Sequence, residues 1–117
     1  MTITTSAVAP VPFQVEVTGS APVRTVLVTG EVDTVTAPAL RAALESVAGE
    51  GTSTEVVVDL CRVTFLDSAG LCALAAAARV ADDAGAGIRV RCATRGVVRV
   101  LQLTGLWESL NAELVGS

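Results

Sequence analysis

The segment Glu55–Leu60, EVVVDL, restricts the possible folds of this chain more than any other. Its β-branched residues favour a strand, and it lacks the simple alternation of a strand that has one face in water. We therefore expect a strand buried on both faces. The stretch after Ser68, AGLCALAAAARVADDAG, is rich in alanine and predicts a helix that ends at Gly85 or Gly87. A buried strand followed by such a helix indicates an α/β fold.

The segments before Glu55 add two strands and a helix. Alternating apolar residues predict strands near Phe13–Val17 and Val23–Val28, joined as an antiparallel hairpin by the turn-prone TGSAP. In APALRAALESVAG the apolar residues recur at helical spacing, which predicts an amphipathic helix that follows Thr36 and ends at Gly49 or Gly51. The buried strand should then run to Asp59 or Leu60.

The segments after the alanine-rich helix again predict a strand followed by a helix. Ile88–Cys92 predicts a fourth strand, and Thr94 is expected to cap a third helix, Arg95–Leu103, that Gly105 stops. The remaining residues fit either a final strand or one more helical turn. The order β-β-α-β-α-β-α predicts an α/β fold with a mixed four- to five-stranded sheet, right-handed crossovers and helices packed mainly on one face.

The length of 117 residues is enough for one hydrophobic core, so we expect a single domain. The first residues, MTITTSAVAPVP, are small, hydroxylated or proline, which predicts a flexible arm over 1–12 and a domain over 13–117. No segment has the pattern of a signal peptide or a membrane span. We therefore expect a cytoplasmic protein.

The charged residues exclude several kinds of chemistry. The net charge is −4, and all eight basic residues are arginine, with no lysine and no histidine. Ser-His-Asp and Cys-His catalytic sites and Schiff-base lysines are therefore excluded. Arg89, Arg91, Arg95 and Arg99 form a local basic cluster, which we expect to be a solvated face rather than a phosphate-binding patch. The acidic balance also argues against direct binding of nucleic acid.

The three cysteines do not predict a disulfide framework. Cys61, Cys72 and Cys92 are odd in number, widely spaced and surrounded by apolar residues, which is typical of reduced thiols in the cytosol. We expect two of them to be plain core residues and Cys72 to be the candidate for exposure.

The heptapeptide FLDSAGL, Phe65–Leu71, places an acid, a hydroxyl and a glycine where the second helix begins. The simplest explanation is that the Ser68 hydroxyl caps the helix by accepting a hydrogen bond from a backbone N–H. The alternative uses the same geometry, because the positive end of a helix and its free N–H groups tolerate a phosphate on Ser68. The fold would hardly respond to that charge, whereas a partner packed against it would respond strongly.

Two blocks in this chain resemble the STAS-domain anti-sigma factor antagonists of bacteria: VTGEVDTVTAPAL at Val28–Leu40 and VVVDLCRVTFLDSAGL at Val56–Leu71. The resemblance implies a STAS-like fold and a non-enzymatic regulator of transcription, for example in a stress response, that needs no cofactor or metal. It implies a partner switch in which the unphosphorylated antagonist binds an anti-sigma factor with serine kinase activity. Phosphorylation by that kinase releases the antagonist, and a phosphatase is a further candidate partner.

The resemblance also implies which residues form the site. It assigns phosphorylation to Ser68, and we expect partner contacts from the set Asp33, Thr36, Asp67, Ser68, Ala69, Gly70 and Cys72. Ala69 stands where the family usually has a second hydroxyl, which leaves Ser68 as the only candidate there. Without the resemblance, Asp33 and Thr36 would be competing caps for the first helix, and Cys72, on the same helical face as Ser68, would be an inert small hydrophobe.

Two other classes of function stay open at this point. The first is an enzyme that uses Glu31, Asp33 and Asp67 as acid, base or magnesium ligands. The second is a STAS scaffold or sensor subunit, either nucleotide-binding or associated with a transporter. The sequence does not indicate whether the chain self-associates.

Overall fold

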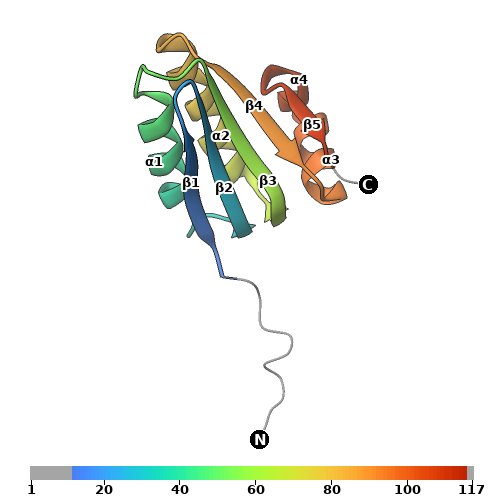
Figure 1. The fold of residues 1–117 in the computed structure, drawn as a ribbon. Coiled ribbons are helices and arrows are strands. Elements are labelled where there is room, and N and C mark those ends of the chain that lie inside the picture. Colours follow the sequence, from blue (N-terminus) through green and yellow to red (C-terminus); the bar gives the residue numbers. More distant parts are fainter. Residues whose placement is uncertain (1–11, 116–117) are drawn as a thin grey trace, which may run out of the picture.

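The computed structural model describes residues 12–115, which form a five-stranded sheet and four helices (Figure 1). The predicted arm, 1–12, lies outside the described residues except for Pro12. The elements along the chain are β1 (Gln14–Ser20), β2 (Val23–Val32), α1 (Ala37–Ala48), β3 (Glu55–Leu66), α2 (Ser68–Asp83), β4 (Gly87–Cys92), α3 (Arg95–Leu103), α4 (Leu106–Ser109) and β5 (Ala112–Leu114).

The sheet has the mixed topology that the sequence predicts. The strand order is β1-β2-β3-β4-β5; β1 runs antiparallel to β2, and the pairs β2–β3, β3–β4 and β4–β5 are parallel. The hairpin and the helical connections are therefore confirmed. At the end of the chain both predicted alternatives occur, because the single helical turn α4 precedes the short edge strand β5.

The third strand is longer than predicted. It continues through the whole of Glu55–Leu66, so the expectation that it ends at Asp59 or Leu60 is wrong. The register with β2 shifts where Leu27 pairs with Asp59 and Thr29 pairs with Arg62, so β3 has an extra residue at this point. Such a bulge breaks the alternation of side chains, which hides the second half of the strand from a pattern search.

The helices cover one face of β3 rather than two, as Figure 1 shows for α1 and α2, which lie behind the sheet. Val56, Val58 and Leu60 are fully buried in the core, whereas Glu55 and Asp59 point the other way and are half-buried. The expectation of burial on both faces therefore holds for Val57, which is buried between them on that other face, but not for Glu55 and Asp59. On that face ion pairs join Arg89 to Glu55 at 3.1 Å and Arg91 to Asp59 at 3.7 Å.

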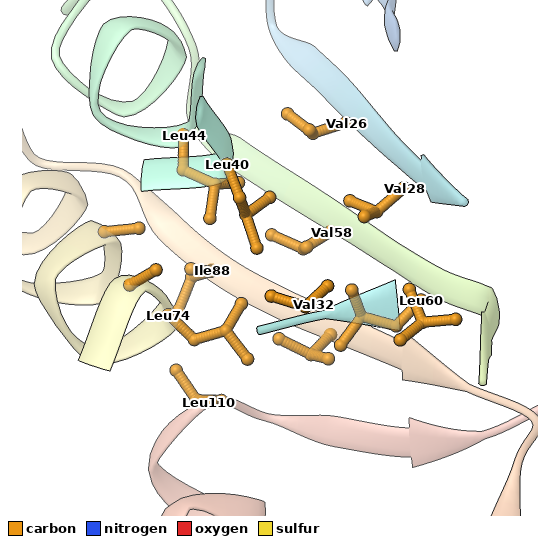
Figure 2. Packing of buried hydrophobic residues seen from close by; sticks show 14 of the residues in the cluster. Val26, Val28, Val32, Leu40, Leu44, Val58, Leu60, Leu74, Ile88 and Leu110 are labelled. Carbon is orange, nitrogen blue, oxygen red and sulfur yellow. The ribbon is translucent and has the colours of Figure 1, made fainter. Parts of the chain in front are cut away.

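One core cluster joins the sheet to the helices. Leu40 and Leu44 of α1 and Leu74 of α2 point toward the valine and leucine side chains of the strands (Figure 2). Val97 and Leu101 of α3 belong to the same cluster. None of the helices within residues 12–115 has the length and apolar character needed to cross a membrane.

The helices begin and end close to the predicted residues, but the predicted capping side chains do not always make the capping hydrogen bond. Gly49 caps α1 at its carboxyl end, and α3 has the predicted bounds with Gly105 at a φ of 78° behind it. Thr94 precedes α3, but its hydroxyl donates to the Val63 carbonyl at 2.9 Å and does not cap the helix. This side chain therefore ties α3 to β3.

Replacing Leu74 with alanine should lower the free energy of unfolding by about 2–5 kcal/mol, because the side chain is fully buried between α2 and the sheet. Urea unfolding of the full chain measures this change. The matched control is Leu103→Ala, since Leu103 is 76% exposed and its removal should change the stability little. Equal losses in the two variants would contradict the described core.

Candidate functional site

The two sequence blocks meet at the edge of the sheet where β2 and β3 end. Val32 pairs with Leu66 as the last residue pair of the two strands, and the Asp67 backbone N–H donates to the Val32 carbonyl at 3.2 Å. The turn before α1 and the start of α2 therefore lie side by side. A hollow of about 380 Å³ lies between them, and its lining consists of Thr34, Ala37, Pro38, Arg41, Ala69, Cys72 and Ala73.

Asp67, not Ser68, caps the second helix. Its carboxylate Oδ1 accepts hydrogen bonds from the Ala69 N–H at 2.9 Å and the Gly70 N–H at 3.2 Å. Ser68 is already the first residue of α2, so the expectation that its hydroxyl provides the cap is wrong. Aspartate and serine are comparably good caps, and the extended backbone at Asp67, with φ −105° and ψ −170°, decides between them.

The Ser68 side chain is exposed to solvent. Within residues 12–115 its hydroxyl makes no hydrogen bond, so the fold does not use this group. The Ala69 and Gly70 N–H groups are occupied by Asp67, which corrects the expectation that free N–H groups of this turn would hold a phosphate. A phosphate on Ser68 would instead lie beside a carboxylate and face the solvent.

Gly70 fits α2 closely against the ends of β2 and β3. It is buried, and a Cβ at this position would overlap Leu66 Cδ1 and lie 2.8 Å from Val32 Cγ1. The missing side chain therefore serves packing inside the domain. Its contact with a partner stays a prediction.

Asp33 and Thr36 act together in the turn before α1. Asp33 Oδ1 accepts from the Val35 N–H at 2.9 Å and the Thr36 N–H at 3.1 Å, while Thr36 Oγ1 accepts from the Asp33 N–H at 2.9 Å and donates to the Glu31 carbonyl at 3.0 Å. The bond from the Thr36 backbone N–H is the main cause that lowers the pKa of Asp33 below its ordinary 3.8. The two residues therefore hold one turn rather than compete for one cap.

The acids near this edge do not form a metal site. In the part of the chain that the structure describes, no group of three cysteine or acidic side chains is arranged to hold a metal ion. Glu31, Asp33 and Asp67 are thus not brought together in the way that the magnesium alternative requires. One carboxylate oxygen each of Asp33 and Asp67 already accepts hydrogen bonds from backbone N–H groups.

Two exposed apolar residues near Ser68 were missed in the sequence. Val35, in the turn before α1, is 82% exposed, and Phe65, which pairs with Glu31 at the end of β3, is 48% exposed. Val35 could have been recognised from the sequence, because it is an apolar residue inside a turn. We refer to Val35, Phe65, Ser68 and Cys72 as the Ser68 surface.

The cysteines differ in their surroundings. Cys72 is exposed, as expected, on the helix that Ser68 begins. Cys92 is buried, and burial raises its pKa to about 12. Cys61 is only partly buried, and burial together with the neighbouring Asp59 raises its pKa to about 11. These two thiols are therefore protonated at neutral pH.

The fold and the site define a STAS-type domain with an exposed serine at the start of its second helix. Residues 14–115 match the family described as "Mlab, STAS domain". The chain belongs to the STAS-domain anti-sigma factor antagonist family. The comparison with curated proteins gives no match.

Solved structures support this assignment. An anti-sigma factor antagonist from Mycobacterium paratuberculosis is 33% identical, with 86% of this chain and 85% of that chain covered and a TM-score of 0.77. Unphosphorylated SpoIIAA is 20% identical over 91% of this chain and 90% of that chain, with a TM-score of 0.75. Phosphorylated SpoIIAA from Bacillus is 19% identical over 91% and 93%, with a TM-score of 0.68. The two SpoIIAA structures show likeness of fold.

Replacing Asp67 with alanine should lower the free energy of unfolding by about 1 kcal/mol, because two N–H groups of α2 lose their acceptor. Asp67→Asn should retain most of the stability, since an amide oxygen can cap as well. Ser68→Ala is the adjacent control and should be close to wild type. Urea unfolding compares the three variants, and a larger loss for Ser68→Ala than for Asp67→Ala would show that the cap is misassigned.

Proposed function

We propose that this protein is an anti-sigma factor antagonist that binds an anti-sigma factor while Ser68 is unmodified. Phosphorylation of Ser68 by the serine kinase activity of that anti-sigma factor releases it. The observation that supports this proposal most directly is the exposure of Ser68 at the start of α2, with capping left to Asp67. The 33% identical anti-sigma factor antagonist supports the class of partner.

The charge of a phosphate explains why one modification switches binding. Phosphoserine carries a charge of about −1.5 to −2 at neutral pH. It would stand next to the Asp67 carboxylate, at the edge of the sheet to which the exposed Val35 and Phe65 also belong. A partner that covers these groups must remove water from the phosphate or supply cations, and either requirement weakens the complex.

We expect phosphorylation of Ser68 to leave the fold unchanged. The Ser68 hydroxyl has no hydrogen-bond partner within residues 12–115, and its side chain lies outside the core. The switch therefore acts on the interface and leaves the domain intact. The proposed role is cytoplasmic regulation of transcription, such as a stress response, with catalysis supplied by the partner kinase and with a phosphatase to restore binding.

Ser68→Asp should lose binding to the cognate anti-sigma factor, whereas Ser68→Ala should bind like wild type. Thr52→Asp is the matched control, because Thr52 is exposed in the loop before β3, at the opposite end of that strand. It introduces the same charge away from the Ser68 surface and should bind normally. Calorimetric titration measures the affinities, and melting temperatures within a few degrees of wild type show that folding is retained. Unchanged binding by Ser68→Asp would refute the switch.

Phosphate should be incorporated at Ser68 only when the anti-sigma factor kinase is present. Intact-mass measurement of the chain after incubation with ATP alone, and then with ATP and kinase, tests this. Ser68→Ala should gain no phosphate and should remain bound to the kinase in the presence of ATP. Phosphate on Ser68→Ala would identify a different residue as the target, and modification with ATP alone would favour a different STAS function.

A further inference from the structure

The arginines of this acidic protein fall into two groups. Four are paired with acids: Arg24 with Glu50, Arg41 with Glu45, Arg89 with Glu55, and Arg91 with Asp59 and Glu113. Within residues 12–115, Arg62, Arg79, Arg95 and Arg99 form no ion pair. The basic cluster predicted from the sequence is therefore divided, because Arg89 and Arg91 are neutralised on the sheet while Arg95 and Arg99 lie on α3.

The two arginines of α3 border an apolar hollow. Arg95, Arg99 and Gln102 lie on the side of α3 away from the buried Val97 and Leu101, whereas Val98 also packs against the core. Together with Leu114 of β5 these four residues line a hollow of about 270 Å³. Figure 1 shows α3 beside β5, at the edge of the sheet opposite β1.

Two large apolar side chains at this edge are exposed. Leu103, one turn after Arg99, is 76% exposed, and Leu114 is 64% exposed. Exposed apolar groups that are bordered by arginines are typical of protein interfaces, where arginine is enriched. We refer to Arg95, Val98, Arg99, Leu103 and Leu114 as the α3–β5 surface.

We propose that the α3–β5 surface is a second binding site, which takes an acidic, leucine-bearing segment of a partner protein. Acidic side chains of that segment would pair with Arg95 and Arg99, and its leucines would cover Leu103 and Leu114. The proposal goes beyond the Ser68 switch, because none of the residues that would hold this segment belongs to the Ser68 surface.

A nucleic acid fits this surface less well. Phosphates would meet two arginines on a chain of net charge −4, since Arg89 and Arg91 are already paired. The exposed leucines would find no apolar counterpart along a phosphate backbone. A protein segment with acidic and leucine side chains can pair with the arginines and cover the exposed leucines at the same time.

The test is a titration of the isotope-labelled full chain with a synthetic amphipathic peptide that has glutamates on one face and leucines on the other. Amide resonances of Arg95–Leu103 and Ala112–Leu114 should shift. The double variant Arg95→Gln/Arg99→Gln should bind roughly tenfold more weakly, as should wild type at high salt. Ser68→Asp should bind as wild type does.

Arg79→Gln is the matched control, because Arg79 is an exposed arginine of α2 that also makes no ion pair within residues 12–115. It should leave peptide binding unchanged. Equal weakening in Arg79→Gln, shifts centred on the Ser68 surface, or the absence of shifts would each overturn the proposal. Shifts of the same α3 and β5 resonances by a single-stranded DNA oligonucleotide that displaces the peptide would also overturn it in favour of a nucleic-acid surface.

Discussion

The site depends on the parallel pairing of β2 with β3 up to their last residues. Val32 opposite Leu66, with the Asp67 N–H bonded to the Val32 carbonyl at 3.2 Å, ends both strands at the same level. Gly70 then lets α2 approach this corner closely, since a side chain there would collide with Leu66 and Val32. Residues that lie more than thirty positions apart in the chain therefore share one edge, and every property of the Ser68 surface follows from that arrangement.

Neighbouring residues divide the structural and regulatory tasks at this edge. Asp67 satisfies the N–H groups of Ala69 and Gly70, so the start of α2 is stable whatever happens to the next side chain. Ser68 is thereby free to change its charge. The same separation holds before α1, where Asp33 and Thr36 bond to each other and leave Val35 exposed. A site built this way can alter what it presents to a partner without altering the domain that carries it.

Elements with a regular residue pattern were predicted correctly from the sequence. The predictions failed where the bounds of an element depend on pairing with a distant strand. The bounds of α3 and the end of α1 at Gly49 follow from local periodicity and capping glycines. The second half of β3 could not be predicted, because its bulge exists only through pairing with β2. The cap of α2 was assigned one residue too late, since aspartate and serine are comparably good caps and only the backbone direction at the end of β3 decides between Asp67 and Ser68. The exposure of Phe65 depends in the same way on where β3 ends.

The distance between the two surfaces determines whether one can be switched without the other. Ser68 follows β3 and Arg95 follows the neighbouring parallel strand β4, so α2 and α3 begin at the same edge of the sheet. The Debye length at physiological ionic strength is about 8 Å, so salt limits the reach of the field of an exposed phosphate to its immediate surroundings. Arg95 and Arg99 would keep their attraction for an acidic segment while the neighbouring Ser68 surface is repelled from its own partner. Two contacts on one small sheet can then respond differently to one phosphoryl group, because solvent screening makes the charge a local signal.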